Sequence, residues 1–210
     1  MKTALITGAR GPLHIAMQAL TLPAMRQYAE RHGYDLRVVD LPDNGRPASW
    51  EKLPMLIDAL RTYDQALWLD ADIAIINGEV DITADVDPVM WQALVIHGFA
   101  NGNIPNCGVW LVRKPMIDIM NYADEVSYLD ETVRNHPWWE QAFLMMEMGY
   151  DINVDFYRKI NTGLWDYTHL LPVEWNWIGL PANELAYFRH GAGIVTPLRM
   201  AMLCEWLHYA

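Results

Sequence analysis

The sequence predicts a single α/β domain over residues 1–210, with a mostly parallel mixed sheet flanked by helices in a Rossmann-like arrangement. The first 72 residues alternate short apolar runs with stretches of helical periodicity in the order β-α-β-α-β, which is typical of a parallel sheet covered by helices. A hydrophobic content of 52% supplies enough apolar side chains for a sizeable core. Since the chain has no internal repeat, low-complexity tract or linker, we expect one domain rather than two.

The first elements follow from local sequence signals. An apolar strand over Lys2–Thr7 leads into a glycine-containing turn, and helical spacing runs from about Ile15 to Arg31. We expect a break in this helix near Pro23, because proline lacks the N–H that the helix needs. Gly33 is expected to end the helix, and Leu36–Val39 is expected to form the second strand.

The remaining elements are assigned in the same way. A loop over 41–47 is rich in Pro, Gly and Asn, and Ser49 is expected to cap a helix that ends near Arg61. The third strand is Ala66–Leu69. The second half is expected to add strands at 93–97, 106–113 and 187–190, and helices at 115–128, 138–148 and 198–207. Residues 151–179 give no clear pattern.

Two carboxylates, Asp70 and Asp72, directly follow the third strand. Residues i and i+2 of an extended segment point the same way, so both side chains are expected at the carboxyl end of the strand, where ligands of such sheets bind. Paired carboxylates repel each other unless a cation lies between them, and Mg²⁺ and Mn²⁺ prefer oxygen ligands. We therefore predict a metal site for a diphosphate, with an ordinary acidic turn as the alternative. Asp85-Val86-Asp87 has the same spacing, but no strand precedes it.

Composition excludes several classes of protein. The formal net charge of −11 disfavours a nucleic-acid backbone as the main partner, although it does not exclude one locally. Only Cys107 and Cys204 are present, so the sequence has neither a disulfide framework nor a cysteine-based zinc site. No run approaches the ~20 apolar residues of a membrane span, and the N-terminal apolar run is too short for a signal peptide. We expect a cytoplasmic protein without a membrane span.

The N-terminus also allows a different interpretation. Residues 4–11 resemble the opening of short-chain dehydrogenases, which bind NAD(P), and Asp40 would be the candidate for the ribose. However, Pro12 and His14 occupy the positions of the later glycines, and no Tyr is followed by a Lys four residues later. A second alternative is a non-catalytic carbohydrate-binding protein, because the chain contains ten tryptophans.

Six segments, taken in order, resemble a known enzyme family. They are Tyr28–Asp35, Trp50–Pro54, Tyr63–Asp72, Asn106–Arg113, Trp139–Gln141 and His190–Gly193. The family comprises the retaining galactosyl- and xylosyltransferases exemplified by fungal α-1,2-galactosyltransferases and plant xyloglucan xylosyltransferases. The resemblance implies a GT-A nucleotide-sugar-binding fold and transfer of a sugar from a UDP-sugar to the hydroxyl of a carbohydrate or other acceptor. Cys107 departs from the family's Thr, and a glycine follows His190 where the family has an aromatic residue.

The resemblance implies the composition of the metal site. His190 is expected as the third ligand of Mn²⁺ or Mg²⁺ beside Asp70 and Asp72, with the strand that ends at His190 lying beside the strand that ends at Asp70. Gly191 and Gly193 are expected to let the backbone approach the diphosphate. The other histidines of interest, His97, His136 and His169, are interpreted as structural.

The resemblance also implies donor and acceptor contacts. The donor contacts are expected from two groups of residues, namely Thr7, Gly8 and Ala9 at the base and ribose, and Arg10, Lys52 and Ala71 near the diphosphate. For Lys52 the alternative is a solvated lysine at a helix start. Asn106 and Gln141 are expected at the transferred sugar, and Glu140 is either a further reacting group or a helix-start acid. Glu140 and Asp166 stay open as nucleophiles. Trp175 and Trp177 are expected to form either a stacking platform or part of the core. The donor sugar, the acceptor, the linkage and the oligomeric state are left open.

Overall fold

A computed structural model describes residues 1–99, 102–152, 157–178, 185–194 and 196–208. Its centre is a six-stranded sheet in the order β2-β1-β3-β6-β5-β7. The strands are β1 (Thr3–Ala9), β2 (Asp35–Asp40), β3 (Gln65–Leu69), β5 (Gln92–Phe99), β6 (Gly102–Arg113) and β7 (Thr168–Leu170). β2, β1 and β3 are parallel, β6 runs antiparallel between β3 and β5, and β7 is parallel to β5. The predicted α/β class with a mostly parallel mixed sheet is confirmed.

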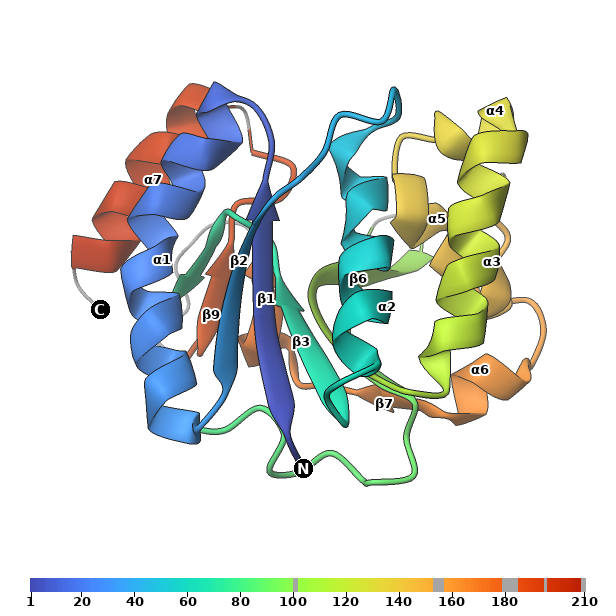
Figure 1. Ribbon diagram of the computed structural model, residues 1–210, viewed down its shortest axis with the longest axis horizontal. Helices are drawn as coiled ribbons and strands as arrows, with labels where there is room; N and C mark the ends of the chain where they lie inside the picture. Colours follow the sequence, from blue (N-terminus) through green and yellow to red (C-terminus); the bar gives the residue numbers. More distant parts are fainter. Residues whose placement is uncertain (100–101, 153–156, 179–184, 195, 209–210) are drawn as a thin grey trace.

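Helices cover both faces of this sheet (Figure 1). One side carries α1 (Pro12–His32) and α7 (Thr196–His208), which lie next to each other. The other side carries α2 (Lys52–Leu60), α3 (Met116–Leu129) and α5 (Trp139–Glu147). The short helices are α4 (Glu131–Arg134), α6 (Gly163–Asp166), η1 (Ala48–Glu51) and η2 (Val173–Asn176). Among the helices of the described residues, none is both long and apolar enough to cross a membrane.

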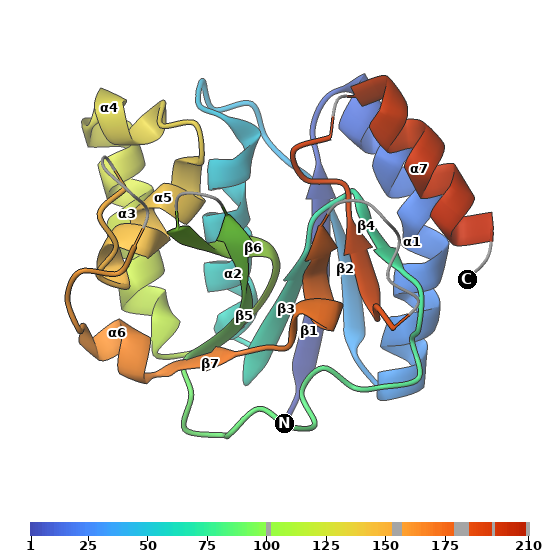
Figure 2. The same cartoon turned by 180° about the vertical axis from the view of Figure 1, so that it is seen from behind.

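A second, three-stranded sheet has the order β4-β9-β8 and comprises β4 (Ile73–Ile75), β9 (Phe188–His190) and β8 (Trp177–Ile178). Figure 2 shows β4 beside α1 and α7, and both helices contact it. β9 pairs antiparallel with β4, so that His190 lies opposite Ile73. The expectation that this strand lies beside β3 is therefore wrong. The chain leaves the main sheet after Leu69, and the strand that receives β9 begins only after the two aspartates.

The alternation of side chains along β3 builds two separate layers of core. Ala66 and Trp68 pack with Leu53 and other residues of α2, α3 and α5, whereas Leu67 and Leu69 pack with residues of α1 and the small sheet. Because successive side chains of a strand point to opposite faces, a strand buried on both sides is mostly apolar. All five residues of β3 are buried; four are apolar, and the first, Gln65, is hydrogen-bonded to Thr3 and Arg113. Asp70 directly follows this buried strand.

Helix α1 is continuous, so the predicted break at Pro23 is wrong. Pro23 and Ala19, whose carbonyl loses its partner, are both exposed, so water can replace the missing hydrogen bond. The buried residues on either side of the proline, among them Met17 and Met25, hold both halves of the helix on the same face. The predicted stop is confirmed, since Gly33 adopts the left-handed conformation at φ 69°.

Ser49 does not cap a helix, which corrects another prediction. It lies inside η1, and α2 begins only at Lys52, with no side-chain cap at either start. Pro47 precedes η1 and its fixed φ leads the chain into this tighter turn. Residues 151–179, which gave no pattern, contain α6, β7, η2 and β8, while 153–156 and 179 lie outside the described residues.

Candidate metal centre

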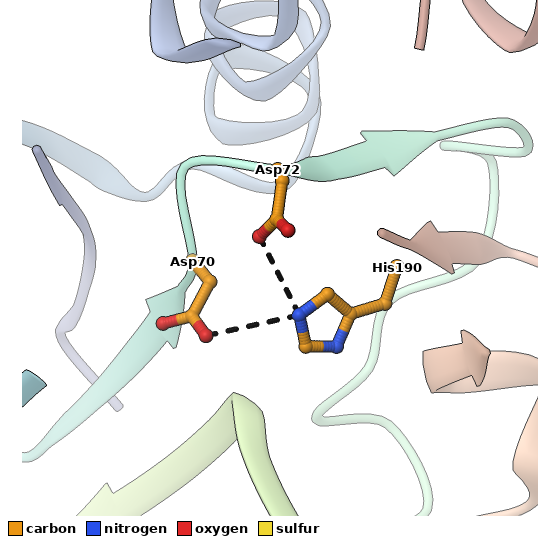
Figure 3. A group of neighbouring side chains, drawn as sticks. All are labelled: Asp70, Asp72 and His190. Carbon is orange, nitrogen blue, oxygen red and sulfur yellow. Dashed lines mark ion pairs between the residues drawn. The ribbon is translucent and has the colours of Figure 1, made fainter. Parts of the chain in front are cut away.

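Three side chains from distant parts of the chain converge at the carboxyl end of β3 (Figure 3). Asp70 follows β3, Asp72 precedes β4, and His190 ends β9. The Nε2 atom of His190 lies 3.8 Å from Oδ2 of Asp70 and 3.4 Å from Oδ1 of Asp72. One ligand atom from each residue lies within 4.8 Å of the other two.

The two aspartates occupy a turn, not the extended segment that the spacing predicted. The amide N–H of Ile73 donates to the carbonyl of Asp70 at 3.0 Å and closes this turn. Thr21 of α1, which is fully buried, donates its hydroxyl to the carbonyl of Ala71 at 2.9 Å. The amide N–H of Gly191 donates to the carbonyl of Asp72 at 3.3 Å. The turn is thus held by α1 and by the segment after β9.

Each carboxylate has one oxygen that is anchored and one that faces the histidine. The Oδ1 atom of Asp70 accepts from Nε1 of Trp68 at 2.6 Å and lies 3.2 Å from Nζ of Lys52. The Oδ2 atom of Asp72 lies 3.2 Å from the guanidinium of Arg199. The remaining oxygens, together with the imidazole nitrogen, form a small set of oxygen and nitrogen donors. Such a set fits Mn²⁺, which accepts both carboxylate and imidazole ligands.

The charges around the site keep the carboxylate of Asp72 ionised. Burial raises the pKa of Asp72, but the neighbouring His190 and Arg199 outweigh it and bring this pKa down to about 2. Lys52 is buried, which lowers its pKa, but Asp70 and Glu140 have the larger combined effect and raise it. The carboxylate of Asp70 therefore lies beside a permanently charged lysine.

Two glycines, which have no side chain, make room for His190 and for Arg199. A Cβ atom on Gly108 would lie 2.2 Å from Cε1 of His190, so only glycine fits there. A Cβ atom on Gly191 would lie 2.7 Å from Arg199 and 3.1 Å from Asp72. These distances explain the glycine in the Asn106–Arg113 segment and the first glycine after His190.

The candidate metal centre lies in a cleft of ≈ 870 Å³, which is within the range of about 300–1,000 Å³ usual for small-molecule sites. The predicted residues that line it are Gly8, Ala9, Arg10, Lys52, Ala71, Asn106, Glu140, Gln141 and Gly193, together with the three metal-ligand candidates. Thr7 does not line it, because its side chain is fully buried in the sheet. Gly191 is also buried and lies behind the cleft wall.

Arg10 and Lys52 make contacts that differ from the predicted ones. The guanidinium of Arg10 donates to the carbonyls of Pro42 and Arg46, both at 2.7 Å, so it holds the loop over 41–47. Lys52 is 3% exposed, and its Nζ lies 2.8 Å from Glu140 as well as beside Asp70. The alternative of a solvated lysine is therefore wrong, and Lys52 joins the metal centre to α5.

Glu140 and Gln141 both reach the cleft from the first turn of α5. One oxygen of Glu140 pairs with Lys52, whereas Oε2 is buried and has no hydrogen-bond partner among the described residues. The side-chain oxygen of Gln141 accepts from the amide N–H of Cys107 at 3.3 Å. Asp166 ends α6 and does not line the cleft. Of the two candidate nucleophiles, Glu140 is the one that lines the cleft.

The aromatic residues of the cleft differ from those expected. Trp175 is buried against Tyr187 and Phe188, so the core interpretation holds for it, and Trp177 does not line the cleft. Trp138 and Trp139 line it instead. Trp139 is 39% exposed at φ 45°, an unusual conformation for a bulky residue, directly before Glu140.

Three further residues of the site carried no signal in the sequence. Arg199 lies on α7 and reaches Asp72, and Asn176 lies in η2 and contacts His190. His97 was interpreted as structural, but it lines the cleft, and burial, followed by the charge of His190, lowers its pKa to about 4. Each of these positions depends on contacts between distant segments, which periodicity does not reveal.

Sequence comparison confirms the resemblance in the first half of the chain. A model of the galactosyl transferase GMA12/MNN10 family matches residues 21–98. An alpha-1,2-galactosyltransferase of Schizosaccharomyces pombe is 34% identical over 86 residues, which cover 37% of this chain and 23% of that protein. The chain thus matches less than a quarter of the length of this curated relative. The residues matched by the family model, 21–98, include both aspartates but not Asn106, Gln141 or His190.

Comparison with solved structures confirms the GT-A fold. A glycosyltransferase involved in the glycosylation of the major capsid of PBCV-1 has a TM-score of 0.73 at 17% identity, over 98% of this chain and all of the other. A galactosyltransferase in complex with donor and acceptor sugar analogs has a TM-score of 0.61 at 13% identity, over 98% and 95% of the two chains. Together with the sequence matches, these similarities support the prediction of a glycosyltransferase enzyme.

Proposed function

We propose that this protein is a metal-dependent glycosyltransferase that moves a sugar from a UDP-sugar to an acceptor hydroxyl with retention of configuration. The observation that carries this proposal is the convergence of Asp70, Asp72 and His190 at a strand end within a cleft of ≈ 870 Å³. The sequence match to the galactosyl transferase family, which includes the two aspartates, gives the reaction class.

Asp70, Asp72 and His190 would hold Mn²⁺ or Mg²⁺. When bound, the ion supplies positive charge next to the diphosphate and offsets the charge that develops on the departing UDP. Arg199 lies beside Asp72 and provides a second cation at the same edge of the cleft. Lys52 acts differently, because its side chain is almost fully buried between Asp70 and Glu140, whereas that of Arg199 is 20% exposed. We assign to Lys52 the orientation of these two carboxylates.

The donor nucleoside is placed at the end of β1, where Gly8 and Ala9 line the cleft. The diphosphate then lies between the metal centre and the turn that contains Gly193, which adopts φ 71° and faces the same cleft. The transferred sugar would contact Asn106, Glu140 and Gln141, which line the same cleft. Trp138 and Trp139 supply aromatic faces for an acceptor carbohydrate or another hydroxyl compound.

Retention is proposed through displacement on one face of the sugar. The bond between the anomeric carbon and the β-phosphate oxygen breaks, the acceptor oxygen bonds to the same carbon, and its proton passes to the departing phosphate. This route needs positioning and electrostatic stabilisation but no protein nucleophile. A double displacement through Glu140 is the second candidate, because its Oε2 has no hydrogen-bond partner among the described residues. A UDP-α-sugar should give an α-linked product by NMR of the anomeric proton, and a β-linked product would contradict retention.

Thermal shift with different ligands tests the proposal against its alternatives. UDP should stabilise the protein only when Mn²⁺ is present, because the diphosphate binds through the ion. Stabilisation by NADH without metal would instead support an oxidoreductase. Stabilisation by glycans alone, with no effect of UDP and Mn²⁺, would support a carbohydrate-binding protein.

A further inference from the structure

We infer that Asn176 is a positioning residue that holds His190 in the tautomer whose Nε2 faces the two aspartates. The evidence is a chain of three hydrogen bonds that starts at the backbone N–H of Gly108 and runs through the side chains of Asn106 and Asn176 to His190. The tautomer follows from this geometry alone, and only its importance for turnover rests on the proposed function.

The first of these three hydrogen bonds, from the N–H of Gly108, fixes the direction of the other two. A backbone amide can only donate, and the N atom of Gly108 lies 2.9 Å from Oδ1 of Asn106, so that atom is the carbonyl oxygen. The same oxygen is 2.8 Å from Nδ2 of Asn176, which must therefore donate. This orientation leaves Oδ1 of Asn176 as the atom that faces Nδ1 of His190 at 3.0 Å. Nδ1 consequently carries the hydrogen.

The position of the hydrogen determines what the opposite nitrogen can do. In a neutral imidazole with hydrogen on Nδ1, the Nε2 atom has a free lone pair. Nε2 faces Oδ2 of Asp70 and Oδ1 of Asp72. Three electron-rich atoms that face one another require a cation, and a hydrogen-bonded second nitrogen is the usual way in which proteins orient a metal-binding histidine.

Burial makes this arrangement rigid. Asn176 is 0% exposed and His190 is 3% exposed, so water cannot readily replace either partner. Gly108 contributes twice, because its N–H starts the chain of hydrogen bonds and its missing side chain leaves room for the imidazole. The Asn106–Arg113 segment thus supports the metal ligand in addition to lining the cleft.

The same hydrogen bonds determine which atom of Asn106 is available to a substrate. Its Oδ1 already accepts two hydrogen bonds, and its Nδ2 makes none to the described residues. Because Asn106 lines the cleft, its Nδ2 group is a donor available to a substrate oxygen. A contact there is coupled through Asn176 to the orientation of the metal-binding histidine.

The first test measures the tautomer in the metal-free wild-type protein. The ¹⁵N spectrum of histidine-labelled protein at about pH 8, where ordinary histidines are neutral, distinguishes hydrogen on Nδ1 from hydrogen on Nε2. The signal of His190 is assigned by its absence from the spectrum of His190→Gln. Hydrogen on Nδ1 is expected. Hydrogen on Nε2, or an equal mixture of tautomers, overturns the inference.

The second test measures the affinity for Mn²⁺ alone, without nucleotide, by calorimetry. Asn176→Leu has a similar size but no hydrogen-bonding group, and loss of such a partner is expected to weaken metal binding about 10–100-fold. Asn121→Leu, at an exposed position on α3, is the control and should leave the affinity unchanged. If Asn176→Leu fails to fold by circular dichroism, Asn176→Ser is measured instead. An unchanged affinity in a folded variant overturns the role of Asn176.

The two proposals fail in different ways. Hydrogen on Nδ1 with metal binding, but without sugar transfer from any UDP-sugar, would retain the positioning role and contradict the proposed function. Sugar transfer by a protein whose His190 carries its hydrogen on Nε2 would do the reverse.

Discussion

The chain contains two Asp-x-Asp sequences, and their surroundings in the fold differ. Asp70 and Asp72 follow a fully buried strand, and their turn is hydrogen-bonded to Thr21 of α1 and to Gly191. Asp85 and Asp87 are both exposed. The carboxylate of Asp87 accepts from the local amide N–H of Val89 at 2.9 Å, and only its backbone carbonyl, not its carboxylate, accepts from Arg113.

The difference shows what an Asp-x-Asp pattern needs before it can be a site. The spacing brings two carboxylates near each other in both places. Among the described residues, only the first pair has carboxylate oxygens paired with cations, Lys52 at Asp70 and Arg199 at Asp72. The other two oxygens of this pair face His190. All three of these residues come from other elements, so the tertiary fold and not the local pattern makes the first pair a candidate metal site.

The largest expected effect contrasts the two pairs directly. Asp72→Asn should leave the fold intact and weaken Mn²⁺-dependent UDP binding about 100-fold or more, since it removes a direct ligand rather than a supporting residue. The matched exchange Asp87→Asn should leave this affinity unchanged. Calorimetry of UDP with Mn²⁺ on both variants is the measurement, and equal losses in the two proteins would remove the distinction between the pairs.

A smaller effect on Mn²⁺ affinity is expected when the space around His190 is filled. Gly108→Ala places a Cβ atom 2.2 Å from Cε1 of His190, so the ring must move away from the aspartates. We expect a loss of Mn²⁺ affinity of about 10–100-fold, as for other disturbed supporting contacts. Gly98→Ala on β5 is the control, because its nearest neighbour would be 3.8 Å away. Similar affinities for the two alanine variants would show that the ring position does not matter.

The smallest effect concerns stability in acid. The pKa of Asp72 is about 2 in the folded protein, below the ordinary value of about 3.9. Its ionised form therefore contributes stability that is fully present above about pH 4 and is lost as the pH falls through 2, on the order of 2 kcal/mol in total. Asp72→Asn should flatten the decline of the unfolding free energy in this interval. Urea unfolding at several pH values measures it, and a decline as steep as that of Asp87→Asn would contradict the account.

The first half of the fold was predictable because its signals are local. The strand at 66–69 and the stop at Gly33 depend on apolar runs and on one glycine conformation, and both are confirmed. The prediction of a break at Pro23 was wrong because Pro23 lies on the exposed face of the helix, and which face is exposed depends on tertiary packing. Residues 151–179 gave no pattern because β7 and β8 are three and two residues long and are defined by their pairing with distant strands.

The candidate site was predictable to the extent that its residues lie in recognisable segments. Asp70 and Asp72 stood out from their position after a strand, and His190 came from the resemblance alone. Asn176 and Arg199 are ordinary polar residues in sequence, and only the fold brings them against His190 and Asp72. Supporting residues of this kind depend on contacts across the whole chain, so a local pattern does not identify them.

The central claim is that the two carboxylates and His190 hold one divalent ion. Electron–nuclear double resonance of Mn²⁺ bound to protein labelled with ¹⁵N at histidine tests it most directly, because only a nitrogen that ligates the ion directly shows a large coupling. We predict a large coupling to one histidine nitrogen in the wild-type protein and none in His190→Gln. The absence of a large ¹⁵N coupling in the wild type, or its persistence in the variant, would contradict the assignment of His190 as a ligand.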